Sequence, residues 1–173
     1  TLQLIRWLYT RQITQASHLA WIVSSSRSLG EIQQFVTALR RKRISRASHI
    51  AQLVHRGRSH EEIMNLIDQL RAQGIRQASH LVQVITGGRS AEEIATVLDT
   101  LRAQGVRNEA HLSRILQGSR SREEVVKLLG SLRSLEITSG GHLATVLHGS
   151  RSHEDIVALF TGMILALQAG IAL

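Results

Sequence analysis

Arginine and serine recur together along this chain at a spacing that could bind a row of anions. The pair returns every 31 residues, at Arg27, Arg58, Arg89, Arg120 and Arg151 with Ser28, Ser59, Ser90, Ser121 and Ser152. A guanidinium beside exposed backbone amides at a helix N-terminus forms a phosphate-binding arrangement. We therefore predict that these residues bind phosphate. The alternative is that each arginine pairs with a glutamate of the neighbouring repeat.

The residues just before these arginines are mostly polar and differ between copies. They are Ser24, Ser25, His55, Arg56, Thr86, Gly87, Gln117, Gly118, His148 and Gly149. Changing polar residues beside a fixed basic one are what a protein that reads one base per repeat would show. We expect base-reading positions here, and the alternative is drift on an exposed loop.

Histidine keeps the same 31-residue step, at His18, His49, His80, His111 and His142. Packed helices lie about 8–10 Å apart, whereas zinc–nitrogen bonds are near 2 Å. One histidine per repeat therefore predicts a structural role rather than a metal site. The chain has no cysteine, which excludes thiolate ligands and disulfides. We expect no metal and no cofactor.

Catalytic motifs are missing from the sequence. There is no Walker loop, HExxH motif or Ser/His/Asp group, and the adjacent acids Glu92 and Glu93 suit a helix start. We expect that the protein is not an enzyme.

Two helices per repeat would position the recurring residues. Residues 75–85 carry apolar side chains at the spacing of a short amphipathic helix. Three copies have a hydroxyl residue as the predicted N-cap, at Thr14, Ser45 and Thr138.

The second predicted helix begins with a Ser-x-x-Glu capping box. Its acids are Glu31, Glu62, Glu93 and Glu124, with Asp155 in the last copy. Ile94, Val97, Leu98 and Leu101 form its apolar stripe. Gly74 and Gly105 are the predicted C-caps.

A fixed period of this length is typical of a helical array in which each repeat packs on its neighbours. We therefore predict an all-α fold, an α-solenoid forming one domain over 1–173. The predicted repeats are 13–43, 44–74, 75–105, 106–136 and 137–167, after a half-repeat at 1–12 and with an apolar C-terminal cap at 156–173. We expect a monomer or a fragment of a longer array, and the start on a half-repeat suggests the fragment.

A net charge of +8 and a pI of about 11.4 favour a polyanionic partner. Acids balance the recurring arginines, so the surplus comes from positions that differ between repeats. Many lie in the turns between repeats: Arg41, Lys42, Arg43, Arg46, Arg76 and Arg107. No apolar run is long enough for a membrane span, so we expect no membrane association.

Residues 86–93, Thr-Gly-Gly-Arg-Ser-Ala-Glu-Glu, lie between a short and a longer predicted helix that ends Ala103-Gln104-Gly105. This arrangement resembles the DNA-binding repeat of transcription activator-like effectors (TALE-like). The resemblance implies that Arg89 and Ser90 contact phosphate and that Thr86 and Gly87 take the place of the base-reading pair. It also implies a bacterial cytoplasm or a host nucleus as the location.

The sequence thus favours a sequence-reading nucleic-acid-binding protein, with duplex DNA preferred over RNA as partner. One alternative is a protein-binding α-solenoid scaffold without a nucleic-acid ligand. Another is a designed repeat protein with no ligand.

Overall fold

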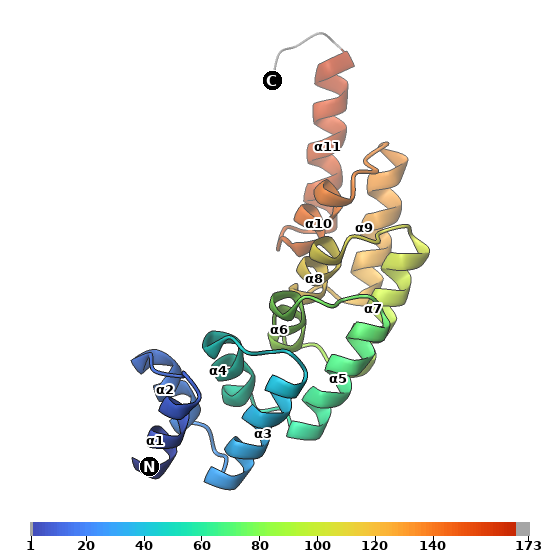
Figure 1. Ribbon diagram of the computed structural model, residues 1–173. Coiled ribbons are helices and arrows are strands. Elements are labelled where there is room, and N and C mark those ends of the chain that lie inside the picture. Colours follow the sequence, from blue (N-terminus) through green and yellow to red (C-terminus); the bar gives the residue numbers. More distant parts are fainter. Residues whose placement is uncertain (1, 169–173) are drawn as a thin grey trace. The chain divides into compact units, whose positions relative to one another are not determined.

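The computed structural model describes residues 2–168, and within this part of the chain it contains eleven α-helices and no strand (Figure 1). The prediction of an all-α chain is confirmed. From α2 onward, short helices of eight or nine residues alternate with long ones of thirteen, and α11 has sixteen. The helices are α1 (Leu2–Thr10), α2 (Ala16–Val23), α3 (Leu29–Arg41), α4 (Ala47–His55), α5 (His60–Ala72), α6 (Ala78–Thr86), α7 (Ala91–Ala103), α8 (Glu109–Gln117), α9 (Arg122–Ser134), α10 (Gly140–His148) and α11 (His153–Gln168).

A serine caps each of the long helices, and three of them have the complete capping box. In α3, α7 and α9 the serine hydroxyl accepts from the third-position amide while the glutamate accepts from the serine amide. Glu62 departs from the predicted pattern, because its carboxylate pairs with Arg58 while Ser59 still caps α5. In the last copy Ser152 accepts from the amide of Asp155.

A Schellman turn ends the long helices. In the third repeat boundary the amide of Ile75 donates to Leu70 and that of Gly74 donates to Arg71, each at 2.9 Å. The residue with positive φ recurs every 31 residues, at Gln12, Arg43, Gly74, Gly105 and Glu136. The prediction that Gly74 and Gly105 end long helices with a left-handed conformation is confirmed. At the other three copies a side chain occupies a conformation that costs about 1 kcal/mol.

Three short helices begin one residue later than predicted. The N-caps of α2, α4 and α10 are Gln15, Arg46 and Ser139, in place of Thr14, Ser45 and Thr138. None of these three makes a side-chain capping bond. The preceding Schellman turn buries an isoleucine, such as Ile44, and extended residues must follow it before the chain re-enters a helix. Asn108 does cap α8, through the amides of Ala110 and His111.

The helices group into two compact units, Thr1–Thr86 and Gly87–Leu173. The division falls inside the predicted repeat 75–105, between the two residues of a predicted base-reading pair. The single domain over 1–173 stays a prediction. Each unit has its own core.

In the first unit the short helices α2, α4 and α6 pack in a row, and α3 packs against α5 (Figure 1). The two layers meet where α3 contacts α4 and α5 contacts α6. Phe35, Ile50 and Leu66 are among the fully buried side chains between them. Burying a side chain of this size contributes about 1.5–3 kcal/mol.

The second unit repeats this packing with α8 against α10, α7 against α9 and α9 against α11. Its last helix, α11, buries Ile156 but exposes Leu159, Met163 and Leu165. The predicted apolar cap at 156–173 lies within this helix up to residue 168, and 169–173 are outside the described residues. None of the helices in the described part is long and apolar enough to cross a membrane.

Candidate nucleic-acid interface

Arg27 reaches forward into the next sequence repeat. Its Nε donates to the carbonyl oxygen of Val54 at 3.2 Å, and its Nη2 donates to the carbonyls of Arg56, at 3.4 Å, and Arg58. These carbonyls lie at the C-terminal end of α4 and in the loop after it, where helical partners are missing. The guanidinium also lies 4.9 Å from the centre of the Phe35 ring. Arg27 therefore ties two successive repeats together.

The equivalent arginines of the second unit make the same connection. Arg89 donates from Nε to the carbonyl of Leu116 at 3.1 Å, and Arg120 donates from Nη2 to the carbonyl of Arg151 at 2.5 Å. Both side chains are buried, with only 6% of their surface exposed. Burial lowers the pKa of Arg89, while two nearby carboxylates act in the opposite direction. Arg151 is exposed.

A second row of arginines reaches backward. Arg40, Arg71 and Arg133 each donate to a carbonyl 29 residues earlier, at Arg11, Lys42 and Gln104. Each of those carbonyls belongs to the residue directly after a helix, which is α1, α3 or α7. Recurring arginines thus contact backbone carbonyls of both the following and the preceding repeat.

The residues of the predicted phosphate site, the recurring arginines and serines, make contacts within the chain. Arg58 pairs with Glu62 of its own repeat, and Arg89 is influenced by the charges of Glu93 in its own repeat and Glu124 in the next. Pairing with a neighbouring repeat's glutamate therefore stays the alternative. The hydroxyl oxygen of each of the five serines accepts a hydrogen bond from a backbone amide in the first turn of the long helix. Phosphate binding by these arginines and serines stays a prediction, although the structure gives most of them partners inside the chain.

Carboxylates further change the electrostatics of this loop. Backbone and hydroxyl hydrogen bonds from Ser28 lower the pKa of Glu31, and those from Ser90 lower the pKa of Glu93. Both carboxylates therefore remain charged in neutral solution, beside the helix start where an incoming phosphate would lie. A negatively charged carboxylate at the helix start repels the negative charge of a phosphate and so disfavours its binding there.

The predicted base-reading residues lie at the C-terminal ends of the short helices and directly after them. His55, Thr86, Gln117 and His148 are the last residues of α4, α6, α8 and α10, and Ser24 is the C-cap of α2. Of the second members, Arg56 and Gly149 are exposed, and Ser25 and Gly87 are half-buried.

Gly118 differs from the other second members because it is buried. A side-chain carbon there would approach the carbonyl oxygen of Ile115 to 3.2 Å and Cα of His148 to 3.5 Å. A glycine therefore fits the close approach to the end of its own helix, α8, and base reading at Gly118 stays a prediction.

Histidines in this row connect neighbouring repeats. Nδ1 of His55 lies 3.2 Å from the carbonyl oxygen of Trp21, and Nδ1 of His148 lies 3.0 Å from that of Arg114. Both contacts span 34 residues, one in each unit. Since a carbonyl only accepts, Nδ1 carries the proton in both. The remaining ring nitrogen, Nε2, is left as an acceptor in the neutral side chain.

Sequence reasoning missed a second variable position one helical turn earlier. It holds Trp21, Gln52, Gln83, Arg114 and Thr145, all exposed or half-buried. Residues three apart share a helix face, so this spacing, applied to the short helices, could have identified it. Arg114 and Thr145 lie side by side in the second unit, with Nη1 and Oγ1 3.4 Å apart.

No family model, curated protein or solved structure matches this chain. The resemblance to transcription activator-like effector repeats stays a prediction. What the chain binds is therefore inferred from its own residues.

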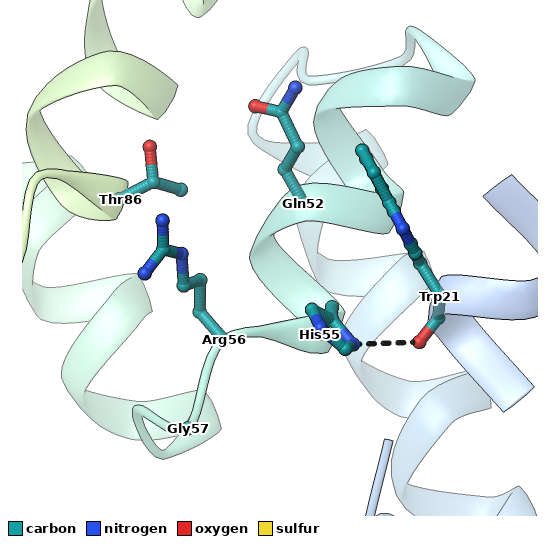
Figure 2. A pocket seen from close by; sticks show the side chains of 6 residues that line it. All are labelled: Trp21, Gln52, His55, Arg56, Gly57 and Thr86. Carbon is teal, nitrogen blue, oxygen red and sulfur yellow. Dashed lines mark hydrogen bonds between the residues drawn. The ribbon is translucent and has the colours of Figure 1, made fainter. Parts of the chain in front are cut away.

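A pocket of about 670 Å³ opens on the variable face of the first unit. Figure 2 shows its lining residues, which come from three successive short helices and the loop after α4. They are Trp21, Gln52, His55, Arg56, Gly57 and Thr86. Three of them are predicted base-reading residues, and Trp21 and Gln52 are the additional variable positions.

Some of the recurring histidines have a buried ring nitrogen, and His111 packs against the next repeat. Nδ1 of His18 and of His49 is buried without a hydrogen-bond partner among the described residues. Burial is the main cause that lowers the pKa of His49. His111 packs against the backbone of Gly140 and Gly141 in the next repeat. No group of three or more potential metal ligands is found in the described part of the chain.

Positive charge is concentrated in one of the two units. Residues 1–86 contain twelve Lys or Arg and four acids, whereas residues 87–173 contain nine of each. The surplus of +8 therefore belongs entirely to the first unit.

The basic turn, defined as Arg41, Lys42, Arg43 and Arg46, is the densest part of this charge. Lys42 pairs with Asp68, with Nζ and Oδ2 2.6 Å apart. The three arginines are exposed. Their guanidinium groups have no hydrogen-bond or ion-pair partner among residues 2–168. They are available to an anion in a way that the buried loop arginines are not.

Proposed function

We propose that the chain is an α-solenoid that binds nucleic acid without catalysis, with duplex DNA as the preferred ligand. The observation that carries the proposal is the confinement of the +8 surplus to residues 1–86. Neutralising phosphates with Lys and Arg supplies most of the affinity of sequence-independent binding. The packing of equivalent helices within each unit and the 31-residue step of their terminal turns support the solenoid.

We assign the phosphate contacts chiefly to the basic turn. Its three available arginines fit this role better than the loop row, because a guanidinium donating to buried carbonyls has fewer donors left for a phosphate. Base contacts would come from the variable residues at the other end of the short helices.

The dimensions of the short helices agree with this division of roles. Nine helical residues span about 13 Å, which is comparable to the roughly 12 Å width of the major groove. One short helix is therefore long enough to have one end at a phosphate and the other at a base edge.

The test is a binding titration with a random-sequence duplex at several salt concentrations. We expect a Kd on the order of micromolar or lower at about 50 mM salt, and a steep loss of affinity by about 200 mM. Parallel titrations with a single strand and with duplex RNA establish the preference among nucleic acids. Absence of binding to all three at low salt would contradict the proposal.

A second candidate function is protein binding through the second unit. Leu159, Met163 and Leu165 are exposed on α11, at 47%, 39% and 59% of their surface. That unit has no net charge, so it offers a polyanion no general attraction. Solenoids commonly present such surfaces to other proteins.

A further inference from the structure

The pocket of the first unit has an aromatic wall that the other variable positions lack. Trp21 lies on α2 with 42% of its surface exposed. The equivalent positions in later repeats hold Gln52, Gln83, Arg114 and Thr145. An exposed indole in a concave polar site is an unfavourable choice for packing alone and a favourable one for binding a flat ligand.

His55 holds this indole in place. The two rings are stacked, with centroids 6.2 Å apart and planes inclined by 24°. The histidine is fixed in turn by its Nδ1 contact with the carbonyl oxygen of Trp21. In Figure 2 the indole is seen nearly edge-on, with one face turned toward Gln52 and the space beside Arg56 and Thr86. The aromatic wall is therefore preorganised.

The polar side chains opposite have unused hydrogen-bonding groups. Neither the Gln52 amide nor the Arg56 guanidinium has a partner among the described residues. A glutamine amide both donates and accepts, as the edge of a nucleobase does, and a guanidinium matches phosphate oxygens. Thr86 donates its hydroxyl to the carbonyl of Val82 at 2.8 Å. No acid lines the pocket.

We propose that this pocket binds an unpaired nucleobase together with its phosphate. The base stacks on Trp21, its edge hydrogen-bonds to Gln52, and Arg56 contacts the phosphate. The pocket volume lies within the range of small-molecule sites. This inference rests on the proposed nucleic-acid function and adds that one base is bound outside a duplex stack. A free mononucleotide and an unpaired base within a strand present the same chemistry.

Tryptophan fluorescence tests the site directly. The Trp7→Phe variant leaves Trp21 as the single indole of the protein. The probes are adenosine monophosphate, a 12-nucleotide mixed-sequence single strand, the fully paired duplex and the same duplex with one bulged base. We expect the single strand and the bulged duplex to quench Trp21 and the paired duplex to bind with little quenching. Quenching by the mononucleotide with an affinity equal to that of the strand would identify the free nucleotide as the source.

Substitutions provide a second readout by fluorescence anisotropy of labelled strands. Trp21→Ala should weaken binding of the single strand and bulged duplex about tenfold, since base–aromatic stacking contributes on the order of 1–3 kcal/mol. Trp21→Phe should restore part of this loss. Arg56→Gln should lower the salt slope for the single strand by about 0.7. Arg107→Gln, which removes an exposed positive charge from the second unit, should leave single-strand affinity unchanged within twofold.

The outcomes separate this site from the general function. The pocket is overturned if the duplex binds but no unpaired probe quenches Trp21, and if Trp21→Ala and Arg56→Gln both bind every probe within twofold of the parent. Nucleic-acid binding itself would then remain intact. Absence of binding by every probe at low salt would overturn both. Circular dichroism of each variant shows whether it is folded.

Discussion

Replacing Arg27 with methionine should destabilise the protein more than removing any other single exposed or half-buried positive charge of the first unit. The substitution keeps most of the aliphatic stem but removes the donors to the carbonyls of Val54, Arg56 and Arg58 and the contact with Phe35. A hydrogen bond from a charged group contributes about 1.5–3 kcal/mol when its loss leaves a buried acceptor unsatisfied. Arg27 is half-buried and one of its bonds is long, so we expect a total loss of about 3 kcal/mol.

The free energy of unfolding is measured by urea denaturation followed by helical circular dichroism. A loss of this size corresponds to a fall in melting temperature of roughly 6–12 °C for a chain of this length. Arg56→Met is the matched control, because it removes the same charge from the same unit and the Arg56 side chain has no partner among the described residues. Arg151→Met tests the same row at its exposed last member, and both controls should change stability by less than about 0.5 kcal/mol.

Equal stability of the Arg27→Met and Arg56→Met variants would refute the structural role of the arginine row. If Arg27→Met also retained its stability but lost duplex affinity, the loop arginines would be phosphate contacts, as the sequence first suggested.

The remaining predictions concern the ends of the long helices. Arg43→Gly and Glu136→Gly should each raise the free energy of unfolding by about 0.5–1 kcal/mol, because glycine adopts positive φ without strain. Gly74→Ala should lower it by about 1 kcal/mol in the same urea assay, and a gain in stability would contradict the assignment of the turn. Because the pKa of Glu93 is lowered in the folded state, its stabilising contribution is present above pH 4.5 and lost as pH falls through the folded pKa. Carboxyl NMR titration should show this low pKa, and Ser90→Ala should raise it; an unchanged value would count against the capping box.

The helices could be predicted from the sequence because their signals are local. Ser-x-x-Glu and the apolar stripe of residues 94–101 determine where a long helix begins and which face is buried. The glycine turns were also readable at Gly74 and Gly105. The equivalent turns at Gln12, Arg43 and Glu136 could not be recognised from residue type, because only their 31-residue spacing from the glycine turns indicates them.

The partners of the arginines could not be predicted from residue types. A guanidinium before a helix start is consistent with a phosphate, a glutamate or a carbonyl, and only the position of the next repeat selects among them. Arg27 and Arg89 reach carbonyls 27 residues ahead, at Val54 and Leu116, which no local pattern indicates. The pocket at Trp21 was missed for the same reason, because its walls come from three separate helices.

The most direct test of the proposed function compares two triple variants of equal charge in a salt-dependent duplex titration. Arg41, Arg43 and Arg46 become glutamine in the first, and Arg107, Arg122 and Lys127, all exposed in the second unit, become glutamine in the second. The first should lower the slope of log affinity against log salt by about 2.7, the value for three lost phosphate contacts, while the second should keep the parent slope. Equal losses in the two variants, or no loss in the first, would contradict an interface centred on the basic turn.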